Sequence, residues 1–325
     1  MKSSAFYDKL QAAWEKHGLL CLGLDPDIEK IPKAIGRNPE VSAIGAFGHA
    51  IIEAVGGSVG IFKPNSAFYE AYGHDGVQYL RLAMRLIRQR NREAVIISDA
   101  KRADIGNTNK GYVIAAFDFL EADAITVNPY LGAEDGIQPF LDCPWNGVII
   151  LCKTSNKGSA EFQDQLVLVP RDALERLDGG RALSLKCSEE WERIGDRLAL
   201  PLHQLVALQA SCRWNKNSNC GLVVGATFPE QLARVRMLVG NDMPILVPGV
   251  GAQGGDLEAS LQAGFDDKSA GLIINNSRGI LYASSGEDYA EAAKKKAEEM
   301  QAKINFIRNA NEQRKQIVGA GSARE

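Results

Sequence analysis

Short apolar runs rich in β-branched residues recur along the chain, separated by longer segments with the periodicity of helices. Most of these runs are apolar throughout, which is typical of parallel strands covered by helices on both faces. Eight strands alternating with helices indicate a single α/β domain over residues 1–325, a closed (β/α)8 barrel (TIM barrel), although an open doubly wound sheet fits the same alternation. The predicted strands are 19–24, 59–63, 94–99, 124–128, 147–153, 221–226, 244–248 and 271–275.

The segments between and beyond these strands predict helices. Near the amino terminus, Phe6, Leu10 and Trp14 fall on one side of an amphipathic helix. At the other end, 286–314 is rich in Ala, Glu and Lys and predicts a solvated helix, while 319–325 is expected to be disordered. The other predicted helices are 41–55, 76–89, 111–120, 230–238 and 257–263.

One gap between strands is much longer than the others. Residues 155–219 exceed the length of a usual βα connection. The first part, 156–164, is polar and loop-like, whereas 188–210 predicts a helix. The segment is either a lid or interface element over the mouth of the barrel, or a surface insertion without a function.

The composition is that of an ordinary globular protein, with 45% hydrophobic and 24% charged residues. A net charge of −3 gives no support to binding of a nucleic-acid polymer. The chain has no apolar run of 18 residues and no signal-peptide core near its amino terminus, so we expect a cytoplasmic protein without a membrane span. The six cysteines lack CxxC spacing and nearby histidines, which favours reduced thiols over a zinc site.

Charged residues follow several predicted strands, at the end of a barrel where catalytic groups collect. Asp99 and Lys101 are two residues apart, so in an extended strand their side chains share a face. With Lys63 from the second strand and Asp104 from the next loop, they predict an alternating array that would keep Lys101 protonated and oriented. The alternative is that these are loop charges on a solvated rim.

A glycine-rich turn follows the seventh strand and suits an anion. Pro248 opens this turn, and its closely spaced glycines let backbone N–H groups approach oxygens, with Gln253 as an added donor. Asp256 would cap the following helix, and Arg278 offers a forked cation from the end of the eighth strand. Loops after strands seven and eight form the usual phosphate site of barrels. The alternatives are a tight turn only and a surface arginine.

Two kinds of site find little support. None of the four histidines falls on a predicted strand end, which disfavours a histidine base or a nucleophilic triad. No GxGxxG follows the first strand, which disfavours a dinucleotide cofactor. The polar strand ends instead favour direct side-chain electrostatics acting on a phosphorylated substrate.

The segment Asp99-Ala-Lys101-Arg-Ala-Asp104-Ile105-Gly-Asn-Thr108 resembles the signature of orotidine 5'-phosphate decarboxylases, in particular of their longer bacterial subfamily (type 2). The resemblance covers roughly residues 5–285. Supporting motifs, in the family's order, are Gly23-Leu-Asp25, Phe62-Lys63-Pro-Asn, Thr126-Val-Asn-Pro-Tyr, Lys153-Thr-Ser-Asn, Pro248-Gly-Val-Gly-Ala-Gln253-Gly-Gly-Asp and Ser277-Arg278.

The resemblance implies a homodimer of (β/α)8 barrels, without metal or cofactor, that converts orotidine 5'-monophosphate to uridine 5'-monophosphate and CO2. This is the last step of de novo pyrimidine nucleotide (UMP) synthesis. By the same resemblance, Asp99 faces the departing carboxylate and Lys101 donates the proton to the C6 carbanion. Asp104, Ile105 and Thr108 reach into the site of the neighbouring subunit.

The resemblance also implies how the substrate is bound. Asp25 and Lys63 contact the ribose, and Lys63 belongs to the catalytic array with Asp104. Ser155 meets the pyrimidine, but Thr154 and Asn156 are polar too, so any of the three is a candidate for the base contact. Gln253 and Arg278 meet the phosphate, and Pro248 and Ser277 are further substrate-binding residues.

Two other functions fit parts of the pattern. A metal-dependent decarboxylase of keto-acid sugar phosphates, from the same barrel suprafamily, shares the Asp-x-Lys-x-x-Asp element. A non-catalytic barrel that binds a phosphorylated ligand would share the glycine-rich turn.

Overall fold

The computed structural model describes residues 4–36, 38–177, 190–251 and 254–322. Eight parallel strands close into a barrel in the order β1-β11-β10-β9-β5-β4-β3-β2. The predicted barrel is thus confirmed, and the open doubly wound sheet is wrong. The barrel strands are β1 Leu20–Leu24, β2 Ile61–Pro64, β3 Val95–Arg102, β4 Ala124–Val127, β5 Gly147–Lys153, β9 Cys220–Val224, β10 Ile245–Pro248 and β11 Leu272–Asn276.

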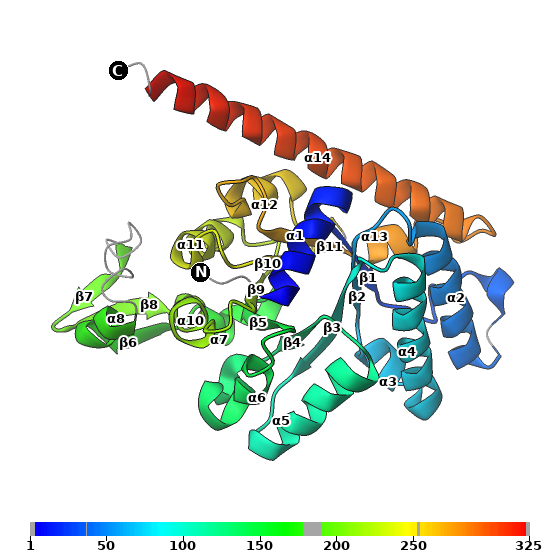
Figure 1. Cartoon of the computed structure of the whole chain (residues 1–325), viewed down its shortest axis with the longest axis horizontal. Helices are drawn as coiled ribbons and strands as arrows, with labels where there is room; N and C mark the ends of the chain where they lie inside the picture. The colour runs from blue at the N-terminus through cyan, green and yellow to red at the C-terminus, as the bar shows by residue number, and fades with distance from the viewer. Residues whose placement is uncertain (1–3, 37, 178–189, 252–253, 323–325) are drawn as a thin grey trace.

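The barrel strands are buried on both faces because helices surround them (Figure 1). The helix α2 shows the packing, since Ile44, Phe47 and Ile51 recur at helical spacing and are each no more than 1% exposed. The helices of the barrel layer, in chain order, are α2 Glu40–Val55, α3 Ala67–Glu70, α4 Gly73–Arg90, α5 Gly106–Val113 continued by a π-helix at Ile114–Phe119, α6 Gln138–Leu141, α11 Pro229–Val239, α12 Leu257–Gly264 and α13 Arg278–Leu281.

The amino-terminal helix α1, Ala5–His17, covers the end of the barrel where the strands begin. Ser4 caps it by accepting the backbone N–H of Tyr7. Its predicted apolar side is buried, and Phe6 packs so closely on Gly147, the first residue of β5, that a β-carbon there would lie 2.6 Å from the phenyl ring. The opposite, carboxyl end of the barrel stays open for a site.

The long segment after β5 folds as a small unit beside the barrel (Figure 1). Its three strands form an antiparallel sheet in the order β6-β8-β7. The predicted helix at 188–210 is wrong over 192–201, because Pro201 cannot sit inside a helix and the residues before it pair as strands, while 188–189 lie outside the described residues. The elements are a 3-10 turn at Lys157–Ser159, α7 Ala160–Gln163, β6 Leu166–Pro170, α8 Arg171–Leu177, β7 Glu192–Ile194, β8 Arg197–Pro201, α10 Leu202–Leu208 and a π-helix at Gln209–Trp214.

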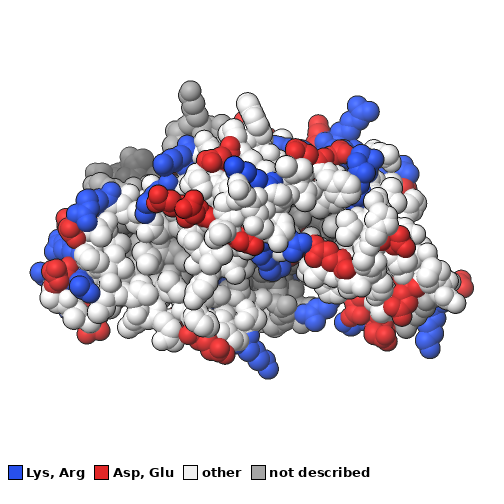
Figure 2. All heavy atoms as spheres, turned by 90° about the horizontal axis from the view of Figure 1, so that it is seen from below, with Lys and Arg blue, Asp and Glu red and all other residues white. Residues whose placement is uncertain are grey.

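The carboxy-terminal helix α14, Tyr289–Ser322, lies across the outside of the molecule (Figure 1). The predicted helix at 286–314 is confirmed from Tyr289 onward. The expected disordered tail is wrong for 319–322, which continue the helix, and 323–325 lie outside the described residues. Within the described residues, none of the helices combines the length and hydropathy needed to cross a bilayer. Figure 2 shows acidic and basic side chains interspersed over one face of the molecule.

Candidate active site

A cavity of about 980 Å³ opens at the carboxyl end of the barrel. All eight barrel strands supply a lining side chain at or just past their carboxyl ends, which is where barrels hold their sites. In order along the chain, these lining residues are Asp25, Lys63, Asp99 and Lys101 (both from β3), Thr126, Cys152, Val223, Pro248 and Asn275.

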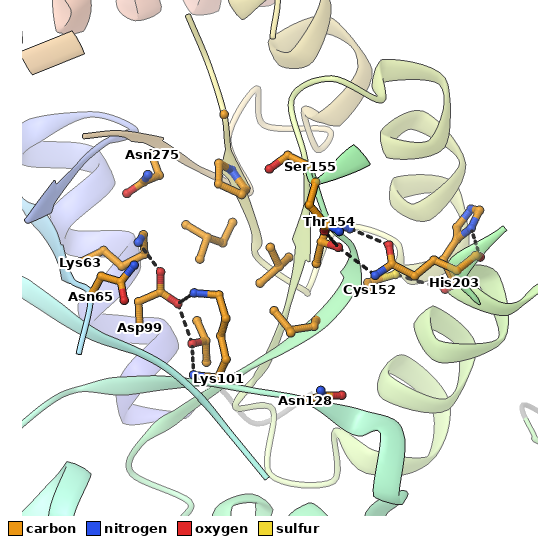
Figure 3. Close-up of a pocket in the computed structure, with 18 of the residues that line it drawn as sticks. Lys63, Asn65, Asp99, Lys101, Asn128, Cys152, Thr154, Ser155, His203 and Asn275 are labelled. Atoms are coloured by element: carbon orange, nitrogen blue, oxygen red, sulfur yellow. Dashed lines mark hydrogen bonds and ion pairs between the residues drawn. The ribbon is translucent and has the colours of Figure 1, made fainter. Parts of the chain in front are cut away.

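On one wall of the cavity, Asp99 binds two lysines (Figure 3). Its Oδ2 accepts from Lys63 Nζ at 2.5 Å and its Oδ1 from Lys101 Nζ at 2.6 Å. Thr126 donates its hydroxyl to the same Oδ1 at 2.8 Å, and its Oγ1 accepts the backbone N–H of Lys101 at 3.0 Å. Lys63 and Asp99 are buried, whereas the Lys101 side chain is 48% exposed and faces the open cavity.

The strand β3 does not run regularly through this pair. Its register with β4 shifts between Ser98 and Arg102, and Lys101 has a φ of 49°, in the left-handed region. The predicted contact between Asp99 and Lys101 is therefore confirmed, but a bulge produces it and not the two-residue period of an extended strand. A lysine in this conformation carries backbone strain of the kind found at functional sites.

Burial opposes charge on both Asp99 and Lys63, and their attraction outweighs it. For Asp99, the ammonium groups of Lys63 and Lys101 overcome desolvation and hold the pKa of the carboxyl well below its usual range. For Lys63, desolvation is overcome by Asp99 and by the more distant Asp25, so the pKa of Lys63 lies above its usual range. Both groups are consequently ionised at neutral pH.

Across the cavity from the lysines lies the turn 154–156, which follows β5 (Figure 3). The backbone N–H of Thr154 donates to Gln163 Oε1, and Gln163 Nε2 donates to Thr154 Oγ1, both at 2.8 Å. The Thr154 hydroxyl in turn donates to Asn156 Oδ1 at 2.6 Å. All three predicted candidates for the base contact, Ser155 included, line the cavity.

Lys153, at the polar end of β5, does not line the cavity, although its position at a strand end suggests that it would. It is fully buried and binds Asp164 Oδ2 at 2.7 Å, in the segment inserted after β5. It therefore does not belong with the described residues that line the cavity. A bulge between Leu151 and Lys153 turns the lysine outward.

A third wall combines the first and last strands. Asp25 lines it, and its Oδ1 is buried without a hydrogen-bond partner among the described residues, so a carboxylate oxygen is available to a ligand. Gly23 permits this wall to form, because a β-carbon there would lie 1.8 Å from Ser277 Oγ. Arg278 follows Ser277, lines the cavity and is exposed.

The glycine-rich turn adjoins this wall. Pro248, Gly249 and Val250 line the cavity, whereas Gln253, the predicted side-chain donor, lies outside the described residues. Asp256 caps α12 by accepting the backbone N–H of Ala259 at 3.1 Å, as predicted.

Asp104, Ile105 and Thr108 do not join the other predicted residues in this chain's own cavity. They belong to the loop after β3 and the start of α5, where Asn109 fixes the loop by accepting the N–H of Asp104 and donating to the backbone oxygen of Gly136 at 2.7 Å. The array expected from residue spacing thus has three members, Lys63, Asp99 and Lys101, within one chain. Ile105 is 61% exposed in the single chain.

Several lining residues were not singled out as site residues from the sequence. Asn65, Thr126 and Asn128 stand inside the motifs that carried the resemblance, so their signal was present. Gln163 and His203 come from the inserted segment, and nothing in their spacing marks them. His203 reaches the cavity wall although it lies on no barrel strand, and burial lowers its pKa, so the ring is neutral at pH 7.

The charges of the cavity suit a substrate with more than one negative group. Three cations, Lys63, Lys101 and Arg278, face two carboxylates, Asp25 and Asp99, among the described lining residues. Arg278 lies beside the glycine turn, where an anion such as a phosphate fits. Lys101 stands apart at the bulge of β3, with an ammonium that can stabilise negative charge or give up a proton.

Residues 18–296 match the model of the orotidine 5'-phosphate decarboxylase / HUMPS family. An orotidine 5'-phosphate decarboxylase of Cellvibrio japonicus is 43% identical over 305 residues, covering 94% of this chain and 99% of the relative. One of a Janthinobacterium species is 41% identical, covering 92% and 98%.

Solved structures agree with these relatives. The structure of Leishmania donovani OMP decarboxylase has a TM-score of 0.70 and 35% identity, covering 93% of this chain and 98% of that one. A Toxoplasma gondii structure described as a putative orotidine-monophosphate decarboxylase has a TM-score of 0.75 and 33% identity, with 94% and 96% covered. Because the match extends over almost the whole length of each relative, the chain belongs to the orotidine 5'-phosphate decarboxylase family.

Proposed function

We propose that Lys101, held by the buried carboxylate of Asp99, carries out the decarboxylation of orotidine 5'-phosphate to uridine 5'-phosphate in this chain. The observation that carries the assignment is the Lys63–Asp99–Lys101 array on the cavity wall, 2.5 and 2.6 Å across its two contacts. The ammonium of Lys101 is the member of the array that is open to the cavity.

The chemistry requires one bond to break and one to form. The bond from ring carbon C6 to the carboxylate breaks, its electron pair stays on C6, and CO2 leaves. C6 then takes a proton from the Lys101 ammonium, which gives uridine 5'-phosphate and a neutral lysine that water reprotonates. Because Asp99 and Thr126 hold Lys101 before the reaction, its charge stabilises the developing carbanion with little reorganisation.

The rest of the cavity orients the nucleotide. The phosphate lies at Arg278 and the glycine turn, where the forked cation and backbone N–H groups meet it. The ribose lies between Asp25, whose Oδ1 lacks a partner among the described residues, and Lys63. The pyrimidine then extends toward the turn 154–156, with C6 at Lys101. Pro248 and Ser277 border the phosphate side, and Gln253 completes it.

A homodimer completes the site. Asp104, Ile105 and Thr108 of one subunit enter the cavity of the other, which accounts for their place outside their own chain's cavity. The exposed apolar side chains Ile105, Ile114 and Tyr130, 57–78% accessible in the single chain, lie on connected elements after β3 and β4 and supply a surface for the partner. Three of the described cysteines, Cys21, Cys152 and Cys220, are buried thiols, as expected for a protein of the reducing cytoplasm.

Replacement of Lys101 tests the proposal. Lys101→Ala removes the proton donor and the charge facing C6, so CO2 release from orotidine 5'-phosphate should fall by at least about a thousandfold. Uridine 5'-phosphate should still bind, since Arg278 and Asp25 are unchanged. A coupled CO2 assay and calorimetric titration of the product measure the two effects.

Lys216→Ala is the matched control, because Lys216 is exposed and lies outside the cavity lining. It should turn over the substrate as the parent does. Near-normal turnover by Lys101→Ala, with its unfolding temperature unchanged, would remove Lys101 from the mechanism.

A further inference from the structure

We infer that Gln163 and Asp164, in the segment inserted after β5, are positioning residues that hold the turn 154–156 against the base end of the cavity. The inference rests on the proposed placement of the pyrimidine at this turn. It assigns a function to the inserted segment: the segment fixes a wall of the nucleotide site.

Both polar atoms of the Gln163 side-chain amide form hydrogen bonds with Thr154. The amide oxygen of Gln163 accepts the backbone N–H of Thr154, and its amide nitrogen donates to the Thr154 hydroxyl, each at 2.8 Å. The side chain of Thr154 thus stabilises the turn, and its hydroxyl donates a further hydrogen bond to Asn156 Oδ1 at 2.6 Å. Thr154 and Asn156 are thus engaged with each other, and Ser155 is the base contact that the family resemblance implies for this turn.

Asp164, the next residue, is anchored by a buried charge. Lys153 is 0% exposed, and its Nζ lies 2.7 Å from Asp164 Oδ2, 3.2 Å from Ser159 Oγ and 4.4 Å from the centre of the Phe228 ring. A buried ammonium is stable only when it is paired, so Lys153 holds Asp164 firmly in place. Lys153 immediately precedes the turn 154–156, and Asp164 immediately follows Gln163. Their ion pair therefore holds together the two ends of the segment 154–163.

A third contact reaches the same pair of residues from α10. His203 Nδ1 lies 2.8 Å from the backbone oxygen of Gln163 and 3.4 Å from Asp164 Oδ1. The neutral ring donates from Nδ1 to that backbone oxygen. Three separate elements, the turn, the end of β5 and α10, therefore converge on Gln163 and Asp164.

The barrel supports the turn from the other side. The backbone N–H of Gly225, just after β9, donates to the oxygen of Lys153 at 2.7 Å. A β-carbon at Gly225 would lie 2.8–2.9 Å from the backbone and β-carbon of Ser155. Ser155 thus packs against Gly225 of the barrel on one side, while the two hydrogen bonds from Gln163 to Thr154 hold the turn on the other. Without these hydrogen bonds, the turn is free to move away from the cavity.

Two ligands separate this positioning effect from general damage. Uridine 5'-phosphate carries the base, whereas ribose 5-phosphate lacks it and uses only the ribose and phosphate contacts. For Gln163→Ala we expect binding of uridine 5'-phosphate to weaken about tenfold, the magnitude of losing one or two neutral hydrogen bonds. Binding of ribose 5-phosphate should stay within about twofold of the parent.

Gln165→Ala is the matched control, since Gln165 is exposed, lies in the same segment and binds only a nearby backbone oxygen through its side chain. It should bind both ligands as the parent does. The conservative variant Gln163→Glu keeps the acceptor for the Thr154 N–H but loses the donor, so it should recover part of the affinity lost in Gln163→Ala. The double variant Ser155→Ala/Gln163→Ala should bind no more weakly than Ser155→Ala, because Gln163 acts through Ser155.

The inference is overturned if Gln163→Ala binds uridine 5'-phosphate as the parent does. It is also overturned if both ligands weaken equally, or if the two single effects add fully in the double variant. Failure of the parent chain to release CO2 from orotidine 5'-phosphate would contradict the proposed function separately, in the same set of assays.

Discussion

At the residue scale, one carboxylate organises the reactive side of the cavity. Asp99 uses one oxygen for Lys63 and the other for Lys101 and Thr126. Lys63 is buried and neutralises one oxygen of Asp99, whereas Lys101 binds the other oxygen and has its ammonium toward the open cavity. A buried ion pair of this kind adds little stability by itself, but removing one member leaves an uncompensated charge.

Asp99→Asn should therefore destabilise the fold at pH 7 by about 3–5 kcal/mol, because Lys63 loses its counter-charge. The pKa of Asp99 is lower in the folded chain than in the unfolded one, so its contribution is present above about pH 4 and is lost as the pH falls through the folded pKa. The pKa of Lys63 is raised, so its contribution is present below about pH 10 and is lost at still higher pH.

Urea unfolding between pH 3 and pH 9 measures this difference. The difference in the free energy of unfolding between the parent and Asp99→Asn should be constant from about pH 5 to 9 and should become smaller toward pH 3. Asp118→Asn, at an exposed position, serves as the control and should unfold with the parent. Equal stability of Asp99→Asn and the parent at pH 7 would show that the buried pair does not contribute as stated.

The sequence predicts residues of this wall better than it predicts their geometry. Asp99 and Lys101 were found because a buried strand delivers them, yet the bulge at Lys101 leaves no pattern in the hydrophobic periodicity. The sequence does not reveal the place of Lys153, since a charged residue at a strand end has the same appearance whether it faces the cavity or, as here, a half-buried aspartate outside it. Gln163 depends on a tertiary contact with Thr154, which spacing along the chain does not encode.

At the element scale, the barrel strands were predicted within three residues at each end because uniformly apolar runs leave few alternatives. The strands of the unit inserted after β5 were not predicted, because they are partly exposed. In β6, half-buried Val167 and Val169 alternate with exposed Leu166 and Leu168, so apolar residues occupy both faces and the two-residue period disappears. The helix predicted at 188–210 is wrong over 192–201 because Pro201 interrupts it and β8 pairs with β6.

The junction of β5 and β9 gives a prediction at this scale. Gly225→Ala places a β-carbon against the backbone of Ser155, which is not the flexible end of a side chain and can yield only if the turn moves. We expect kcat/KM for orotidine 5'-phosphate to fall at least about tenfold, with a loss of stability of about 1–3 kcal/mol from overpacking. Steady-state kinetics and thermal unfolding measure the two effects.

Gly57→Ala provides the comparison, since a β-carbon at Gly57 meets no atom within 4 Å. Its kinetics should match those of the parent. A Gly225→Ala variant with unchanged kcat/KM would mean that the turn tolerates displacement and that its position does not limit the reaction.

At the scale of the whole molecule, the proposed dimer makes the sites depend on both chains. Lys101 and Asp104 are three residues apart, but only Lys101 lines its own chain's cavity. A hybrid of one Lys101→Ala chain and one Asp104→Ala chain should therefore have one intact site of its two, and about half the activity of the parent dimer. Each variant alone should be inactive. Co-expression with two different tags and tandem purification isolates the hybrid for assay.

The reciprocal hybrid pairs a Lys101→Ala/Asp104→Ala chain with an unchanged chain. Both of its sites would then lack one residue, so it should be inactive, although one of its chains is intact. Half-activity in this second hybrid, with none in the first, would mean that each chain completes its own site.

The insertion after β5 also bears on the entropy of the chain. Val148 of β5 pairs with Cys220 of β9, so this seam closes a loop of about 70 residues, whereas Ala124 of β4 pairs with Gly147 of β5 over about 20. Closure entropy grows only with the logarithm of loop length, and the longer loop costs roughly 1 kcal/mol more. The barrel can thus carry a second folded unit at its mouth for about the free energy of a single hydrogen bond.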